Sequence, residues 1–215
     1  MAFNPNQLLN NPLNILNLQG AKPPKAEPPR PPAAPVPAPE VVPAVESELP
    51  FDKGLYLDAY SRLGLLRIAN VADLGCGAGN FAKIMAEKNQ KPELYIGVDQ
   101  SHAKIQGAKA ACPGWRFVYG DFNSEKVKAE YERFEAYLLL NVLDAIEDDL
   151  GFLEGVGSGK HLVVSFPRGP REGSLRFFPD NFSLRERYSS LINIKSVGSY
   201  RGGGGLLGMV LAERW

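Results

Sequence analysis

Residues 71–81 have the sequence VADLGCGAGNF and join an apolar, strand-like stretch to a helix-like one. Gly75, Gly77 and Gly79 let the backbone turn sharply and approach a ligand where a Cβ would collide. The first turn of the following helix would add free N–H groups and a partial positive charge. The stretch therefore predicts a strand–turn–helix unit that binds a ligand, with a tight turn that binds nothing as the alternative.

The acid that precedes this turn indicates the kind of ligand. A dinucleotide-binding turn requires the pattern G-x-G-x-x-G/A. Here the third glycine comes one residue early, and Asn80 stands in its place. Asp73 would crowd a pyrophosphate, whereas a carboxylate at this point can meet the ammonium group of an amino-acid moiety, directly or through water. The pattern thus argues against a dinucleotide.

Two further acids follow the next two strand-like stretches. Asp99 ends the stretch that contains Gly97 and lies 24 residues beyond Gly75. An acid at such a strand tip accepts hydrogen bonds from both ribose hydroxyls of a nucleoside, and Ser101 is typical of a helix N-cap. Asp121, followed by Phe122, comes after the third stretch. We therefore expect three acids at one edge of a sheet.

Outward from the turn, apolar stretches alternate with helix-like ones, a pattern typical of parallel β-α-β units with both sheet faces covered. The last two stretches are joined by glycines and not by a helix, so they predict an antiparallel hairpin. The fold class is therefore α/β, a seven-stranded, mostly parallel, doubly wound sheet. We expect a lead-in helix at 51–66, strands at 70–74, 94–98, 115–119, 136–142, 161–166, 192–200 and 206–215, and helices at 79–88, 101–111, 124–132, 147–155 and 181–190.

The pattern D-x-G-x-G-x-G at 73–79 resembles motif I of the class I S-adenosylmethionine-dependent methyltransferases, and the three acids are spaced as in that family. The resemblance spans roughly residues 50–215 and implies S-adenosylmethionine as the cofactor. In the family, the third acid receives the adenine amino group, and the apolar residue after it packs on the ring. The residues that the resemblance assigns to the cofactor are Asp73, Gly75, Cys76, Gly77, Gly79, Asp99, Gln100, Asp121, Phe122 and Asn141.

Residues 140–149 resemble the segment after strand four in the small-molecule members, whose centre is often Glu-His-Ile/Val. Asp144 takes the acid position and Ile146 the aliphatic one, but Ala145 replaces the histidine. A base role of that histidine cannot be transferred to this chain. The sequence also lacks the Asn/Asp-Pro-Pro-aromatic pattern of base amino-methyltransferases and the Pro-Cys nucleophile of cytosine C5 enzymes. The resemblance therefore implies a small-molecule methyl acceptor.

The loop after the fifth strand, residues 165–178, is rich in Arg, Pro and Phe and is expected to cover the acceptor. From Arg168 onward the chain has eight Lys/Arg and four Asp/Glu, whereas residues 121–154 have three and ten. A basic, aromatic loop suits an anionic or planar acceptor. Alternatively, the arginines are surface charges and the phenylalanines belong to the core. The candidate catalytic residues are Asp144, Tyr56 and Arg168.

Composition excludes several other classes of protein. Positive and negative residues balance at 24 each, so no general attraction to nucleic acid or anionic membranes is expected. Two cysteines without metal-ligand spacing argue against a disulfide scaffold and a metal site. No apolar run approaches the roughly 18 residues that span a bilayer, and no secretory signal is evident. A cytoplasmic protein is expected.

The N-terminal part of the chain has a different composition. Of the 18 prolines, 13 lie in residues 1–50, so residues 21–49 are predicted to form an extended or disordered linker. Residues 1–20 interleave leucines with asparagines and are either a disordered terminus or a docking segment for a protein partner. Three hypotheses result: methyl transfer to a small molecule, a cofactor-binding assembly component tethered by this segment, and methylation of a nucleic acid or protein.

Overall fold

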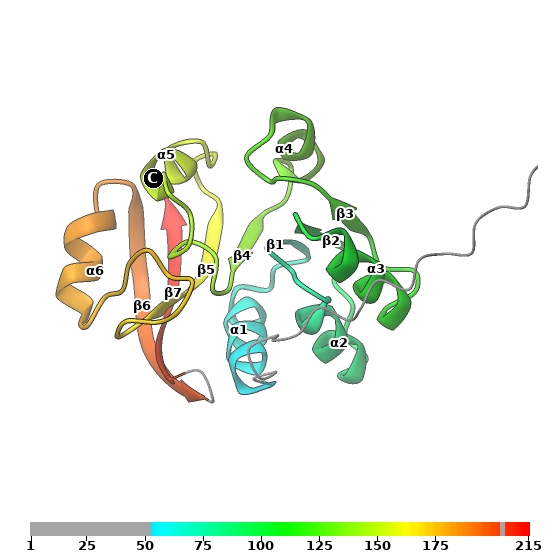
Figure 1. The fold of residues 1–215 in the computed structure, drawn as a ribbon, viewed down its shortest axis with the longest axis horizontal. Helices are drawn as coiled ribbons and strands as arrows, with labels where there is room; N and C mark the ends of the chain where they lie inside the picture. The colour runs from blue at the N-terminus through cyan, green and yellow to red at the C-terminus, as the bar shows by residue number, and fades with distance from the viewer. Residues whose placement is uncertain (1–52, 203–204) are drawn as a thin grey trace, which may run out of the picture. The chain divides into compact units, whose positions relative to one another are not determined.

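The computed structural model describes residues 53–202 and 205–215 (Figure 1). The predicted docking segment and linker lie outside the described residues, as does the middle of the predicted glycine turn at 202–205. Contacts divide the chain after Val45, and every described residue belongs to the unit Glu46–Trp215. We therefore describe the fold of this unit alone.

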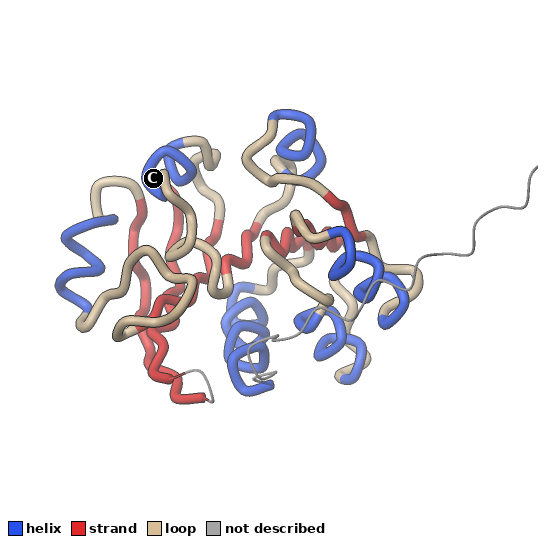
Figure 2. The backbone as a smooth tube through the Cα atoms, viewed as in Figure 1, coloured by secondary structure: helices blue, strands red, loops and turns tan. Residues whose placement is uncertain are grey.

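The strands of the described residues form one mixed sheet (Figure 2). They are β1 (Asn70–Leu74), β2 (Leu94–Asp99), β3 (Phe117–Tyr119), β4 (Ala136–Leu139), β5 (His161–Pro167), β6 (Ile192–Gly202) and β7 (Gly205–Arg214). Their order is β3-β2-β1-β4-β5-β7-β6. β1 to β5 pair in parallel, and β7 pairs antiparallel with both β5 and β6. The predicted seven-stranded sheet and its C-terminal hairpin are confirmed.

Three helices cover each face of this sheet. They are α1 (Lys53–Leu66), α2 (Asn80–Glu87), α3 (His102–Ala111), α4 (Glu125–Tyr131), α5 (Asp149–Glu154) and α6 (Asn181–Tyr188). Residues of α1, α2 and α3 share one buried cluster with one set of strand side chains, and residues of α4, α5 and α6 share another. In Figure 1, α1 and α2 lie below the central strands and α4 and α5 above them.

The side-chain alternation of the strands produces these two layers. In β1, Val71 belongs to the cluster under α1 to α3, whereas Ala72 and Leu74 belong to the opposite cluster. Successive residues of a strand face opposite sides of the sheet. Asp73 therefore faces the same side as Val71, toward the N-terminal three helices. Both faces are buried, which explains the nearly continuous apolar strands.

Two strands are shorter than the sequence suggested. β3 begins at Phe117 and not at 115, and β4 ends at Leu139 and not at 142. Beyond β4 the backbone turns away from the sheet, because Asn141 has a left-handed φ of 58°. Apolar composition alone cannot reveal this turn, since Leu140, Val142 and Leu143 continue the apolar run.

Candidate cofactor site

The glycine turn, residues 75–79, joins β1 to α2 and has left-handed backbone at alternate positions. Gly75, Gly77 and Gly79 have φ values of 77°, 56° and 76°, which L side chains rarely adopt. A Cβ on Gly75 would collide with Cγ2 of Val142, whereas a Cβ on Gly77 would meet nothing within 4 Å. Close packing thus requires Gly75, while Gly77 borders open space that a ligand can enter.

The neighbouring strand and helix hold this turn in place. The N–H groups of Gly75 and Cys76 donate to the carbonyl oxygen of Val98 at 2.7 and 3.0 Å. α2 starts directly after Gly79, which provides no side-chain cap, so its first N–H groups are available to a ligand. The thiol of Cys76 is buried, and burial raises its pKa. Cys76 therefore contributes its backbone, not a reactive thiolate.

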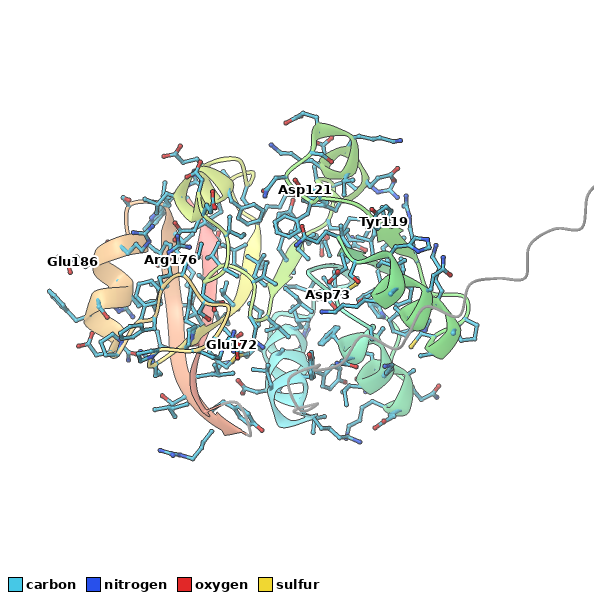
Figure 3. The ribbon with its side chains drawn as sticks, viewed as in Figure 1. Asp73, Tyr119, Asp121, Glu172, Arg176 and Glu186 are labelled. Atoms are coloured by element: carbon cyan, nitrogen blue, oxygen red, sulfur yellow. The ribbon has the colours of Figure 1, made fainter. Side chains whose placement is uncertain are left out.

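Asp73 lies in the interior beneath the turn (Figure 3). Its Oδ2 accepts a 2.8 Å hydrogen bond from the hydroxyl of Tyr95. Burial raises the pKa of Asp73 from 3.8 to about 7; the Tyr95 hydrogen bond opposes this rise, and the charge of Asp99 adds to it. A carboxyl with this pKa exchanges its proton near neutrality, and a nearby cation favours its charged form.

Asp99, at the tip of β2, links the turn to α3. One carboxylate oxygen accepts the N–H of Gly77 at 2.9 Å and the other accepts the N–H of Ser101 at 2.8 Å. Each carboxylate oxygen has a second lone pair, so both can still accept from hydroxyl groups. Ser101 caps α3 as predicted, because its side chain accepts from the N–H of Lys104.

The third acid lies farther out, in the connection between β3 and α4. Asp121 is exposed, and its Oδ1 accepts the N–H of Asn123 at 2.8 Å. Figure 3 shows it near α4 and beside Tyr119. Phe122 is half-buried and meets Phe152 edge-to-face, with 5.6 Å between ring centroids. Gln100 is exposed directly after β2.

Asn141 lies beyond the end of β4, next to the glycine turn, because the adjoining Val142 packs against Gly75. Its N–H donates to Oγ of Ser165 at 2.7 Å, and that hydroxyl donates back to Oδ1 of Asn141 at 3.2 Å. Ser165 is fully buried on β5. The side chain of Asn141 is therefore held beside the turn by a neighbouring strand.

The acid position of the same segment is not an open catalytic group. Asp144 is 0% exposed, and its Oδ2 accepts from Arg171 at 3.3 Å and from the hydroxyl of Ser174. The backbone N–H of Leu175 also donates to the carbonyl oxygen of Asp144 at 2.9 Å. Asp144 thus binds the 168–178 loop to the segment after β4.

The arginines of the 168–178 loop are half-buried and hydrogen-bonded within the protein. Arg176 donates to the carbonyl oxygens of Leu143, Ile146 and Glu147. Arg168 donates to the carbonyl oxygen of Phe178 and to the side chain of Asn181. These contacts fasten the loop and leave the prediction of an anionic acceptor without support from these residues.

The other two catalytic candidates are placed as follows. Arg168 is half-buried at the end of β5, and burial lowers its pKa. Tyr56 lies on α1, is half-buried and packs against the cluster beneath α1 to α3. The hydrogen bonds of Arg168 go to Phe178 and Asn181, whereas Asp144 pairs with Arg171 and Ser174, so the catalytic role of the three candidates stays a prediction.

A groove of about 920 Å³ runs between α4 and α5. Phe122, Tyr137, Ile146 and Gly157 are among the residues that line it. The groove exists because α4 and α5 have only 7 and 6 residues and leave part of the sheet face uncovered. It reaches the site at Phe122 and lies on the opposite face from Asp73.

A family model described as a methyltransferase domain matches residues 71–156. The matched residues extend from β1 to α5 and contain the glycine turn and the three acids. This part of the chain is therefore similar to the methyltransferase domain family.

Solved structures of methyltransferases share this fold. Magnesium protoporphyrin IX methyltransferase from Synechocystis, with S-adenosylhomocysteine bound, superposes with a TM-score of 0.54 and 16% identity over 75% of this chain and 84% of that one. The N-methyltransferase NodS from Bradyrhizobium japonicum, also with S-adenosylhomocysteine bound, superposes with a TM-score of 0.57 and 17% identity. The superposition covers 77% of this chain and 88% of NodS. These likenesses establish the fold.

A shorter stretch has higher sequence identity. Over 68 residues the chain is 34% identical to trans-aconitate 2-methyltransferase from Escherichia coli. This stretch makes up 32% of this chain and 27% of that enzyme. The chain thus spans about a quarter of the length of this relative.

Among the described residues, no helix is long and apolar enough to cross a membrane, and no cluster of three His, Cys, Asp or Glu side chains could hold a metal.

Sequence reasoning from the family missed Tyr95, Ser165 and Arg171. Tyr95 has the same side-chain direction as Asp99 on β2, four residues earlier, so alternation could have placed it on the face of Asp73. Ser165 is the one hydroxyl within the apolar run from Leu162 to Pro167, which is a usable signal. The partners of Arg171 lie 27 and 30 residues away in sequence, and no local pattern indicates them.

Proposed function

We propose that this chain binds S-adenosylmethionine at the carboxyl ends of β1 and β2 and transfers its methyl group to a small molecule. The observation that carries the proposal is the open left-handed turn at Gly77, bordered by Asp73 and Asp99. Ligands of open α/β sheets bind at the carboxyl edge where the strand order reverses. Here that reversal lies between β1 and β4.

The residues present fit the parts of this cofactor. Asp73 has the charge and burial to pair with the ammonium group, and Asp99 retains lone pairs for two ribose hydroxyls. Asp121 keeps one oxygen without a backbone bond for the adenine amino group, and the ring of Phe122 adjoins it. Cys76, Gly79, Gln100 and Asn141 complete the proposed cofactor set around the turn.

S-adenosylmethionine bound there would supply a methyl group activated by a sulfonium. Alignment and exclusion of water are then the main tasks of this chain's residues, and a base is needed only for a protonated nucleophile. We assign Asp144 to alignment, since its carboxylate is buried and paired. Tyr56 and Arg168 stay as candidates that contact the acceptor. Relatives named for trans-aconitate and magnesium protoporphyrin support a small-molecule acceptor.

One observation favours a second function, a cofactor-binding component without turnover. Asp144 is the acid of a segment that has Ala145 where relatives often have histidine, and it is fully buried in an ion pair. Neither Asp144 nor Ala145 is therefore an open base. In that case the chain would bind the cofactor and act through a protein partner of residues 1–20.

Calorimetry with S-adenosylmethionine tests the cofactor site. Wild type should bind, and Asp99→Ala should lose about ten- to hundredfold in affinity, the equivalent of about 1.5–3 kcal/mol for charged hydrogen bonds. The control is Glu87→Gln, on an exposed pair with Lys53 at the far end of α2. Absence of wild-type binding would sink the proposal. Formation of S-adenosylhomocysteine with acceptors such as trans-aconitate separates turnover from binding alone.

A further inference from the structure

Arg171 connects the 168–178 loop to the end of β4 through two partners at once. Its Nη1 donates to Oδ1 of Asn141 at 2.8 Å, and its Nη2 lies 3.3 Å from Oδ2 of Asp144. The side chain of Arg171 is 14% exposed and that of Asp144 is 0% exposed. A planar guanidinium can serve two acceptors in fixed directions, which a lysine ammonium cannot do equally well.

The residue that Arg171 holds is under backbone strain. Asn141 has a φ of 58° although it is not a glycine. Such residues persist only where the surroundings fix them, and they cluster at functional sites. Ser165 fixes the backbone N–H of Asn141, and Arg171 fixes its side-chain oxygen. The direction of the Asn141 amide therefore depends on two residues outside its own segment.

This amide lies beside the proposed cofactor. Val142, the next residue, packs on Gly75 of the glycine turn, and β4 is the direct neighbour of β1 in the sheet. With its oxygen taken by Arg171 and Ser165, the NH₂ group of Asn141 is the part that can donate to a ligand. Loss of either anchor would let the amide rotate.

The network also contains two buried polar atoms without a protein partner, Oδ1 of Asp144 and Nε of Arg171. Buried polar atoms are nearly always hydrogen-bonded, so such atoms in one ion pair need an explanation. Both belong to the link between the 168–178 loop and the end of β4. An incomplete polar network next to the cofactor region fits a site that is completed by a polar group of a ligand.

We propose that Arg171 is a positioning residue for the cofactor: it orients the amide of Asn141 and so makes S-adenosylmethionine affinity depend on the anchoring of the 168–178 loop to the end of β4. This inference rests on the proposed function of the site. It gives the 168–178 loop a role in cofactor binding.

A double-mutant cycle on cofactor affinity tests the proposal with the full chain. Arg171→Lys keeps a positive charge beside Asp144 but loses the fork that reaches Asn141. It should weaken S-adenosylmethionine binding about tenfold, near 1.4 kcal/mol. Asn141→Gly removes the amide and relieves the strain at φ 58°. Because Arg171 acts through this amide, Arg171→Lys should cost no further affinity in the Asn141→Gly background.

Two arginines serve as controls. Arg185→Lys changes an exposed residue of α6 and should leave affinity and melting temperature unchanged. Arg187→Lys weakens a different buried ion pair, with Asp149, and should lower the melting temperature without changing cofactor affinity. Ser165→Ala removes the second anchor of Asn141 without altering charge. It should weaken binding, and in the Asn141→Gly background only the part of this loss that acts through the side-chain oxygen of Asn141 should vanish, because the backbone N–H that Ser165 accepts remains.

The outcomes distinguish this proposal from the function on which it rests. If wild type does not bind S-adenosylmethionine, the proposed function fails. If wild type binds but Arg171→Lys and Ser165→Ala bind equally well, the positioning role of Arg171 is overturned and the cofactor site stands. Additive losses from Arg171→Lys and Asn141→Gly would equally overturn it, because Arg171 would then act by another route.

Discussion

At the scale of single residues, Asp73 combines a buried carboxyl with a titration near neutral pH. Burial raises its pKa to about 7, partly offset by the hydrogen bond from Tyr95 and increased by the charge of Asp99. If the charged form binds the ammonium group of the cofactor, S-adenosylmethionine affinity should rise about tenfold from pH 6 to pH 8. Asp73→Asn should bind more weakly and show no such rise in calorimetry.

Tyr95→Phe provides the matched variant for this pH dependence. Removing the hydroxyl removes a hydrogen bond that lowers the pKa of Asp73, so the rise in affinity should move to higher pH. The free energy of unfolding changes with pH in the opposite direction to the cofactor affinity. Because the folded pKa exceeds the unfolded value, Asp73 makes the free energy of unfolding fall as pH increases from about 4 to about 7. A wild-type affinity that is flat from pH 6 to pH 8 would contradict the ammonium contact.

How far the site could be predicted from sequence also differs residue by residue. The strand-tip acids Asp73 and Asp99 were predictable, because strand ends and turn glycines are local features. The burial of Asp144 was not, since it results from Arg171 and Ser174 on a loop about thirty residues later. The catalytic role expected for Asp144 stays a prediction.

At the scale of elements, the role of Gly77 in the glycine turn can be tested against Gly159, a glycine of similar backbone conformation that lies outside the turn. Gly77 and Gly159 both have positive φ and would have open space around a Cβ. Their alanine variants should therefore lose similar stability, about 1–2 kcal/mol for left-handed backbone. Only Gly77→Ala should also lose cofactor affinity. Thermal unfolding measures the stability of both variants and calorimetry their cofactor affinity. If Gly77→Ala and Gly159→Ala bind S-adenosylmethionine equally well, the cofactor does not contact the turn at Gly77.

Gly75→Ala extends this comparison. Its Cβ would collide with Val142 in addition to requiring a left-handed backbone. The variant should therefore lower the melting temperature more than either Gly77→Ala or Gly159→Ala, because the segment after β4 must shift. If Gly75→Ala melts at the same temperature as Gly77→Ala, the segment after β4 can shift to accommodate the Cβ without a loss of stability.

A second element-scale feature is the buried charge that joins α5 to α6. Asp149 is 1% exposed and pairs with Arg187 and Arg176. Asp149→Asn should cost about 3–5 kcal/mol of unfolding free energy, as removal of one partner from a buried pair usually does. Glu213→Gln, in an exposed pair with Lys195, should cost less than about 1 kcal/mol. Urea unfolding at pH 7 measures both.

The pH dependence of this pair follows from the pKa of Asp149. Burial alone would raise it, but hydrogen bonds from Arg187 and Tyr188 and the charge of Arg176 lower it below 3.8. Its contribution is therefore present above about pH 4 and is lost as pH falls through the folded pKa. The difference between wild type and Asp149→Asn should shrink in acid; a constant difference would contradict the ion pair.

Element prediction succeeded where periodicity and capping were local. β1 was predicted at its observed bounds, and Ser101 marked the start of α3. The end of β4 was missed because the apolar run continues into Val142, while the left-handed Asn141 is fixed by Ser165 on another strand. Tertiary contacts of this kind leave no periodic trace in sequence.

At the scale of the whole molecule, the sheet and both helical layers form one unit with two cores. The described members of these buried clusters run from Leu55 to Ala212. The proposed cofactor residues also lie within this span, from Asp73 to Asn141. The unit Glu46–Trp215 thus contains both buried clusters and the residues that we propose bind the cofactor.

Deletion of residues 1–49 should therefore leave the melting temperature within about 2 °C of the full chain, since a change of about 1 kcal/mol would move it by 2–4 °C or more. S-adenosylmethionine affinity should also be unchanged. If the N-terminal segment serves assembly, only the interaction with a partner should be lost. A truncated chain that melts earlier or binds the cofactor more weakly would show instead that the N-terminal residues complete the fold or the site. The melting temperature and the cofactor affinity together decide whether folding and cofactor binding are independent of residues 1–49.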